Sequence, residues 1–272
     1  MIQKDDRNAQ ENQRICELIK DYVKNYQALN PTETAWGEPI IGFADADDEM
    51  FYSLPRIIGP DYALPADVLP EARSVISYFI PFTEELVESN IDEIESSSEW
   101  DCANIETNAL LIDLNKYLQD ILAKEGYHTS MLPPSYQYDE EELVSNWSHK
   151  SVAYIAGLGK FGIHHLLITE KGCCGRFGSV VTDMELTPSQ RPKEEFCLYR
   201  HDGSCGECMK RCVADAFCRQ GLEVYYDRQK CNDQIYNGNL PKYINGVGDT
   251  CGKCMCGVPC SLVNPVRKKK KC

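Results

Sequence analysis

The chain has 272 residues, of which 43% are hydrophobic and 10% aromatic, a composition typical of a folded globular protein rather than a disordered or fibrous one. Its formal net charge of −14 argues against broad binding of nucleic acid, which needs clustered lysine and arginine to neutralise phosphates. No apolar run approaches the roughly 18 residues of a membrane helix, and the polar start, MIQKDDRNAQENQ, does not resemble a secretory signal. We therefore expect a cytoplasmic protein without a membrane segment.

Helical and strand patterns alternate from the start of the chain. Apolar and aromatic residues between Ile15 and Tyr26 follow helical spacing, which predicts an amphipathic helix. The short runs EPIIGFA and SVISYFI predict two buried strands. The segment between them carries four prolines, and we expect it to lack regular structure but to be ordered enough to line a pocket.

The middle of the chain continues this alternation. The stretch EELVESNIDEIESSSEWD is interpreted as an acidic surface segment, and a strong helix is predicted from about Ile105 to Lys124, with Gly126 at its C-cap. The run YHTSML predicts a strand, and DEEELVSNWSHKSVAYIA begins acidic, as a helix N-terminus should. Alternating helices and strands predict an α/β sandwich.

A glycine-rich segment, AGLGKFG at residues 156–162, contains the spacing G-x-G-x-x-G. The dinucleotide-binding motif needs a strand before these glycines and a helix after them. Here a helical pattern precedes them and two strand-like runs, IHHLLIT and RFGSVVTDMEL, follow, so we do not predict nicotinamide binding. Three residues without a Cβ atom can still let the backbone approach a large flat cofactor closely.

Two histidine positions flank this segment. His149 and Lys150 are interpreted as a solvated or core pair, with contact to a cofactor as the alternative. His164 and His165 are expected on a strand, one of them hydrogen-bonded in the core. The chain has 15 tyrosines, so no single one can be chosen as a proton donor.

Cysteine is concentrated at the C-terminal end, where 11 of the 15 cysteines lie from Cys197 onward. In a reducing cytosol this favours metal or cluster ligation over disulfides. The run CGECMKRC, residues 205–212, matches the last two intervals of the ferredoxin pattern C-x2-C-x2-C-x3-C, and Asp202 stands where the first cysteine would be. Cys197 can supply the missing thiolate if its loop folds back.

The spacing predicts two 4Fe-4S clusters, because a C-x2-C turn directs two thiolates at one cube and a cysteine further along reaches a second cube. One predicted ligand set is Cys197, Cys205, Cys208 and Cys260, with Cys256 as the rival for the last place. The other predicted set is Cys212, Cys231, Cys251 and Cys254. The remaining cysteines are interpreted as turn residues (Cys173, Cys174) or isolated buried thiols (Cys16, Cys102, Cys218).

A zinc ribbon is the alternative for the cysteine-rich end. The C-x2-C pairs at 205/208 and 251/254 have the form of its two ligand pairs, although about forty residues separate them. Because a ribbon leaves three further cysteines of this region unused, we favour clusters.

The chain resembles the epoxyqueuosine reductase-like family of cobalamin-dependent iron–sulfur proteins, relatives of the catalytic part of reductive dehalogenases. The resemblance lies in ARSVISYFIPF, VAYIAGLGKFGIHHLLITEKGCCGRFGSVVTDMEL and the cysteine-rich end. It implies a nitroreductase-like α/β corrinoid-binding domain over residues 1–190 and a ferredoxin-like two-cluster module over residues 191–272, with a base-off corrinoid between them. It also implies that the eight cysteines hold the clusters and that the corrinoid contacts Ala156, Gly157, Leu158, Gly159, Lys160, Phe161 and Gly162.

The chain departs from that family at several positions. Lys160 stands where the family usually carries tryptophan, and Val213 replaces the usual proline after the cysteine run. The family's catalytic aspartate has no secure counterpart near PPSYQYDEEEL, so we assign no catalytic residue. The sequence ends soon after Cys260, without room for the helical-repeat domain that helps to bind tRNA, and this argues with the acidic charge against a tRNA substrate.

We therefore predict a corrinoid-dependent oxidoreductase that passes electrons from two 4Fe-4S clusters to a cobalamin and on to a substrate. An external low-potential electron donor is expected, and the expected substrate is a small molecule or a corrinoid protein. The alternatives are a ferredoxin-type electron-transfer protein that binds no corrinoid and a zinc-stabilised binding protein. Cobalamin binding by the reconstituted protein distinguishes the first two.

Overall fold

The structure is a computed structural model that describes residues 2–130, 132–221, 223–238 and 250–271. Its centre is an antiparallel sheet in the order β1–β2–β7, formed by β1 (Ile40–Asp45), β2 (Ser74–Pro81) and β7 (Gly175–Thr182). All eight residues of β2 are buried, as expected for a central strand covered on both faces. The two strands predicted at EPIIGFA and SVISYFI are thus confirmed, and they pair with each other.

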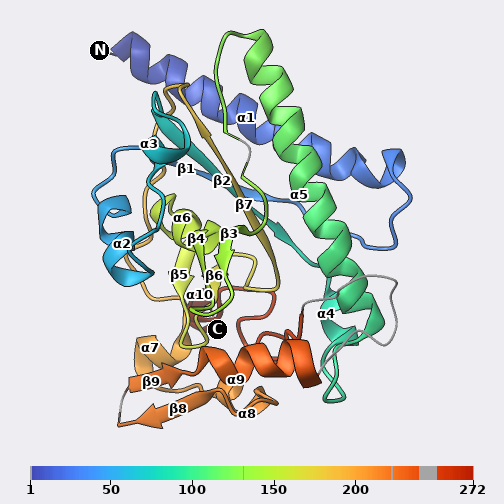
Figure 1. Cartoon of the computed structure of the whole chain (residues 1–272). Coiled ribbons are helices and arrows are strands. Elements are labelled where there is room, and N and C mark those ends of the chain that lie inside the picture. Colours follow the sequence, from blue (N-terminus) through green and yellow to red (C-terminus); the bar gives the residue numbers. More distant parts are fainter. Residues whose placement is uncertain (1, 131, 222, 239–249, 272) are drawn as a thin grey trace.

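Two long helices, α1 (Ile2–Leu29) and α5 (Ser98–Lys124), lie on one side of the sheet (Figure 1). Their apolar stripes share one buried cluster with alternate residues of β2. The Ser97 hydroxyl caps α5 by accepting the Trp100 N–H at 3.1 Å, and Gly126 ends the helix region with φ at 88°. Both predicted helices are confirmed, and each begins earlier than the apolar pattern indicated.

A buried hydrogen bond joins this helical layer to the sheet. The Tyr78 hydroxyl donates to Asn115 Oδ1 at 2.7 Å, and Asn115 Nδ2 donates to the Leu132 carbonyl at 3.0 Å. We expect Tyr78→Phe to lower the free energy of unfolding by about 1–3 kcal/mol, because a buried amide oxygen loses its donor. Urea denaturation measures this loss, and Tyr52→Phe, at an exposed tyrosine, is the matched control. Equal stability of the two variants would contradict the prediction.

Short helices cover the other face of the sheet. They are α2 (Leu54–Ile57), α3 (Pro65–Val68) and α6 (His149–Ile155), with a 3-10 turn η1 at Phe51–Ser53. Phe51, Trp147 and Val152 form a second buried cluster there with Val75 and Phe79 of β2. The proline-rich segment therefore does contain regular structure, because proline is tolerated in the first turn of a short helix.

Two further expectations are wrong in the middle of the chain. No strand forms at the described residues of YHTSML, where only an isolated bridge joins Thr129 to Thr182. The acidic run before α6 is the turn of a hairpin, β3 (Tyr136–Asp139) and β4 (Val144–Trp147), rather than a helix start. The Asp139 carboxylate accepts the N–H groups of Glu141 and Glu142, a local turn bond that competes with helix formation.

The glycine segment leads into a small hairpin of β5 (Gly159–Phe161) and β6 (Leu167–Thr169). His164 and His165 lie in its turn, so the expected strand position for them is wrong. The turn residue His165 has φ at 59°, a conformation that no strand residue adopts.

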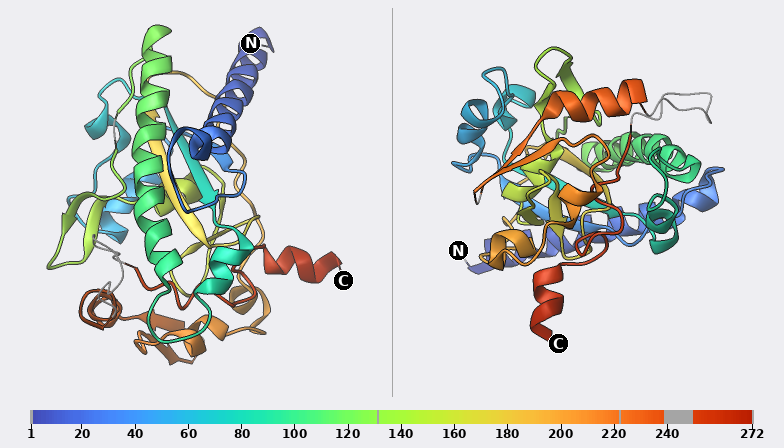
Figure 2. Two further views of the ribbon diagram at one scale, coloured as in Figure 1. Left: turned by 90° about the vertical axis from the view of Figure 1, so that its right-hand side faces the viewer. Right: turned by 90° about the horizontal axis from the view of Figure 1, so that it is seen from below.

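The cysteine-rich end gathers below the sheet in Figure 1. It contains α7 (Leu198–Asp202), α8 (Glu207–Arg211), β8 (Phe217–Gln220), β9 (Glu223–Tyr226), α9 (Arg228–Asp233), the π-helical turn η2 (Gln234–Gly238) and α10 (Pro265–Lys271). Figure 2 shows α10 extending away from the rest of the molecule. None of the helices in the described ranges combines the length and the apolarity needed to cross a bilayer.

Candidate functional site

Four cysteines of the C-terminal end lie around one small cavity of about 20 Å³: Cys197, Cys205, Cys208 and Cys260. The loop after α7 turns at Gly203, whose φ is 74°, and so brings the first two of them together. Ile163, Val258 and Pro259 give the cavity apolar walls. The predicted first ligand set therefore shares one site, although Cys260 is 52 residues from Cys208 in the sequence.

The thiols of this first set affect each other electrostatically. Burial, followed by the neighbouring sulfurs of Cys260, Cys197 and Cys205, raises the pKa of Cys208 to about 12. Thiols with raised pKa values ionise when a metal supplies compensating positive charge. The donor set thus fits a cationic iron centre.

The second predicted set also comes together. Burial raises the pKa of Cys254, as do the nearby sulfurs of Cys251, Cys231 and Cys212 in that order. Cys212 ends α8 and Cys231 lies in α9, so this site joins both cysteine runs through two helices. The tyrosine at the end of β9, Tyr226, has its pKa raised by burial and then by a hydrogen bond with Cys231.

The spacing of the cysteine sulfurs tests the zinc-ribbon alternative. A tetrahedral zinc with Zn–S bonds of about 2.3 Å holds its sulfurs about 3.8 Å apart. Among the described residues, no three cysteines of either set have all their sulfurs within 4.8 Å of one another. The described residues therefore do not form the closely spaced sulfur group that a zinc ribbon requires.

Cys256 does not line the cavity of the first set. Its side chain is fully buried, and its sulfur accepts a hydrogen bond from Asn90 Nδ2 at 3.5 Å. The adjacent Cys174 thiol, whose pKa burial raises strongly, interacts with Cys256 as well. Of the two cysteines left as rivals by the sequence, Cys260 is the one that faces Cys197, Cys205 and Cys208.

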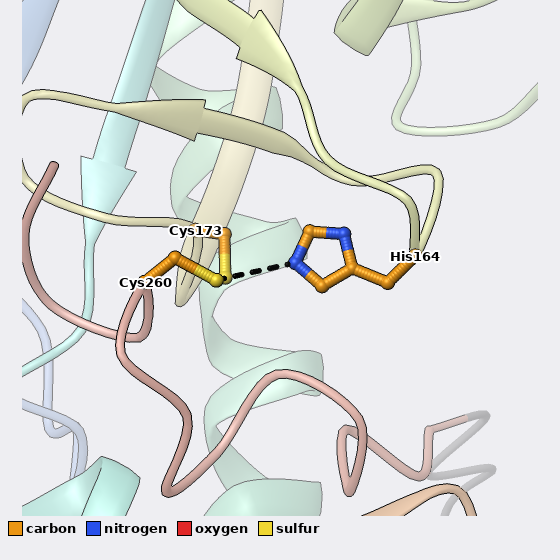
Figure 3. Close-up of side chains that lie close together, drawn as sticks. All are labelled: His164, Cys173 and Cys260. Carbon is orange, nitrogen blue, oxygen red and sulfur yellow. Dashed lines mark hydrogen bonds between the residues drawn. The ribbon is translucent and has the colours of Figure 1, made fainter. Parts of the chain in front are cut away.

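The cysteine pair at the turn before β7 has contacts that the sequence did not indicate. Cys173 and Cys174 are buried, and their backbone N–H groups donate to the carbonyls of Cys260 and Ser261 at 2.9 and 3.0 Å. The sulfurs of Cys173 and Cys260 and a ring nitrogen of His164 all lie within 4.8 Å of one another (Figure 3). No local spacing predicts this contact, because 87 residues separate Cys173 from Cys260 in the sequence.

The isolated cysteines are only partly as expected. Cys16 and Cys102 are half-buried, whereas Cys218 is exposed, so the prediction of a buried thiol is wrong at Cys218. It lies on β8, half of a two-stranded sheet with no further strand to cover it.

The space that a Cβ atom would occupy at Gly157 or Gly159 is already filled by other parts of the chain. A Cβ at Gly157 would lie 2.8 Å from the Gln190 carbonyl oxygen, and one at Gly159 would lie 2.0 Å from the Ile168 carbonyl oxygen. The chain's own backbone fills these directions: Gly159 packs within the β5–β6 hairpin, and Gly157 packs against residues 190 and 191. Ala156 and Leu158 are buried in the second core cluster as well.

Lys160 and Phe161 are the half-buried side chains of this segment. The Lys160 ammonium lies 5.3 Å from the centre of the Tyr154 ring, and the Phe161 ring lies 5.6 Å from the same ring. Together these three side chains form a cationic and aromatic surface, which is the part of the segment available to a ligand.

His149 and Lys150 have different surroundings. His149 is buried and bonds Ser179 Oγ at 2.8 Å and the Pro133 carbonyl at 2.9 Å, so the interpretation as a core histidine is confirmed for it. The Lys150 ammonium donates to the His165 carbonyl at 3.4 Å. Burial lowers the pKa of Lys150, whereas the nearby sulfur of Cys254 acts to raise it. The Lys150 ammonium is therefore close to the second cysteine set.

Acid should destabilise the fold through His149. Burial lowers its pKa to about 4, below the ordinary value of about 6.5, so the unfolded chain binds the proton more readily. This contribution to stability is present above pH 6.5 and is lost as the pH falls towards 4, by up to about 3 kcal/mol. We expect His149→Gln to have a flatter stability profile than the wild type over this window, measured by urea denaturation at several pH values. Parallel profiles would contradict the assignment.

The acidic segment before α5 is not simply surface. Asn90 Nδ2 donates to the Cys251 carbonyl at 2.9 Å, and the buried Lys253 ammonium donates to the carbonyls of Asp92 and Asn90 at 2.6 and 3.2 Å. Trp100 and Asp101 are buried too. The segment, which includes α4 (Glu84–Ser89), therefore holds the second cysteine run in place.

No protein-family model and no curated protein matches the chain. Among solved structures, the catabolic reductive dehalogenase NpRdhA in complex with 3-bromo-4-hydroxybenzoic acid matches 85% of this chain and 31% of its own, with 16% identity and a TM-score of 0.56. A reductive dehalogenase structure concerned with B12-dependent dehalogenation matches the same shares at 16% identity and a TM-score of 0.55. Epoxyqueuosine reductase from Streptococcus thermophilus matches 82% of this chain and 62% of its own, with 18% identity and a TM-score of 0.51.

These similarities concern the fold. The chain shares its mixed α/β fold with epoxyqueuosine reductases and reductive dehalogenases, which confirms the resemblance noted in the sequence at the level of structure. It spans less than two thirds of the length of each of these proteins.

Proposed function

We propose that the chain is an iron–sulfur oxidoreductase of the epoxyqueuosine reductase-like type, which holds two 4Fe-4S clusters and works with a cobalamin. The observation that carries this proposal is the gathering of eight cysteines from distant segments into two sets. The fold shared with reductases, one of them concerned with B12-dependent dehalogenation, supports it.

The chain's own residues have defined tasks in this proposal. The eight thiolates bind the iron, and the apolar walls at Ile163 and Val258 keep water from the first site. When bound, the clusters supply one-electron transfer and the corrinoid supplies the reactive metal. Lys150 adds a partly buried positive charge near the second set, which favours an added electron there.

The proposal also includes a domain division and partners. Residues 1–190 form the corrinoid-binding part and residues 191–272 the ferredoxin-like part. A low-potential donor outside the chain supplies electrons in the cytoplasm, and the substrate is a small molecule or a corrinoid protein. The net charge of −14 weighs against tRNA.

Anaerobic reconstitution tests the first half of the proposal. We expect about eight iron atoms and about eight sulfides per chain, with broad visible absorption. Zinc in place of iron, or no metal at all, would overturn the cluster assignment. Metal analysis of protein purified without added iron gives an independent check.

Cobalamin addition tests the second half. We expect the reconstituted protein to retain cobalamin on gel filtration and to alter its absorption spectrum. If elution and spectrum stay unchanged while iron is present, the chain is a ferredoxin-type electron-transfer protein that binds no corrinoid. The filled space behind Gly157 and Gly159 is the observation that favours this second function.

A further inference from the structure

The imidazole of His164 has a defined tautomer. The Leu166 N–H donates to His164 Nδ1 at 3.2 Å, so this nitrogen accepts and carries no proton. His164 is buried, so its ring is held in this orientation by the surrounding chain. The single ring proton is therefore on Nε2.

The protonated nitrogen of this ring faces a cysteine of the first set. His164 Nε2 lies 3.5 Å from Cys260 Sγ (Figure 3). Both residues line the cavity with Cys197, Cys205 and Cys208. An N–H group directed at a sulfur donates a hydrogen bond, and an ionised sulfur is a stronger acceptor than a thiol.

The backbone on the other side of Cys260 is held firmly as well. The Cys173 N–H donates to the Cys260 carbonyl at 2.9 Å. Gly172 has φ at 78°, and a Cβ there would lie 2.2 Å from the Ser261 carbonyl oxygen, so the turn packs directly against the far cysteine run. Cys260 is thus fixed from both its backbone and its sulfur.

We propose that His164 is a positioning residue for the first cluster: its Nε2–H donates to the Cys260 sulfur, holds that sulfur towards the cavity in preference to Cys256, and raises the cluster's reduction potential. The proposal rests on the proposed function, since it requires a cluster ligated by Cys260. A hydrogen bond to a ligand sulfur stabilises the more negative, reduced cluster more than the oxidised one.

A pair of substitutions separates the hydrogen bond from the bulk of the ring. His164→Leu removes the donor, whereas His164→Gln keeps an N–H near the position of Nε2. His165→Leu is the matched control, because His165 is the adjacent imidazole in the same turn and its ring packs on Tyr226 at 5.1 Å. The readouts are iron and zinc content and reductive titration followed by electron paramagnetic resonance.

We expect His164→Leu to retain its iron and to shift one of the two reduction steps to lower potential. The expected change is about tenfold in the equilibrium constant of one-electron reduction, which is about 59 mV. His164→Gln should keep the wild-type value, and His165→Leu should not move that step.

The outcomes separate this inference from the proposed function. Wild-type protein without iron would end the proposed function, whereas full iron in His164→Leu with unchanged potentials would overturn only the role of His164. If His164→Leu loses about half of its iron, restoration by His164→Gln supports the role and equal loss in His164→Gln overturns it. A third outcome would also overturn the role of His164. If the wild-type protein holds one zinc ion per chain, and both His164→Leu and Cys173→Ala lose it, then His164, Cys173 and Cys260 bind a single metal ion.

Discussion

Replacing Cys208 with serine is expected to remove one of the two proposed clusters and about half of the iron, about four atoms of eight. Its sulfur is buried at the cavity that Cys197, Cys205 and Cys260 share, so its loss leaves three cysteines lining that cavity. Iron and sulfide analysis after anaerobic reconstitution measures the loss, and the visible absorption should fall by a similar fraction.

Three further substitutions make this result specific. Cys254→Ser should remove the other cluster, and Cys260→Ser should behave like Cys208→Ser. Cys256→Ser should keep all of the iron, because its sulfur faces Asn90 and Cys174 and does not line the cavity. Cys102→Ser, at a half-buried thiol on α5, is the control for loss of a cysteine as such. Full iron in Cys208→Ser would refute the assignment of the first set.

Replacing Gly159 with valine is expected to prevent stable folding. A Cβ at this position would lie 2.0 Å from the Ile168 carbonyl oxygen and 3.2 Å from the Thr169 Cα, both backbone atoms of the paired strand. Neither atom can move aside without breaking the β5–β6 pairing, so a loss of several kcal/mol in the free energy of unfolding is expected. Soluble yield and thermal unfolding measure it.

Gly59→Ala is the matched control, because a Cβ there meets only Val144 Cγ2, at 3.9 Å. The stability of this variant should stay within about 0.5 kcal/mol of the wild type. The corrinoid contact that the family resemblance implies for Gly159 predicts a different result, namely loss of cobalamin with the clusters spared. A folded Gly159→Val protein that keeps its iron and loses only cobalamin would restore the cofactor role of this glycine.

Hydrophobic periodicity predicted the elements whose partners are apolar. The strands β1 and β2 and the helices α1 and α5 form where their spacing indicated, since each buries a continuous apolar face. The pattern failed where polar contacts decide the structure. Asp139 forms a turn through its carboxylate, and Asn90 and Lys253 bind backbone carbonyls that no local spacing reveals.

The sequence by itself determined the chemistry that we propose for this protein. Cysteine intervals such as C-x2-C act over a few residues, so they predict thiolate ligands for a metal centre without knowledge of the fold. The tertiary structure alone decided that Cys260 rather than Cys256 faces the first cavity, that His164 directs its Nε2 at that sulfur, and that the glycines serve packing. These relations join residues far apart in the sequence, and the packing of the whole chain sets them, because side-chain direction over such separations has no local cause.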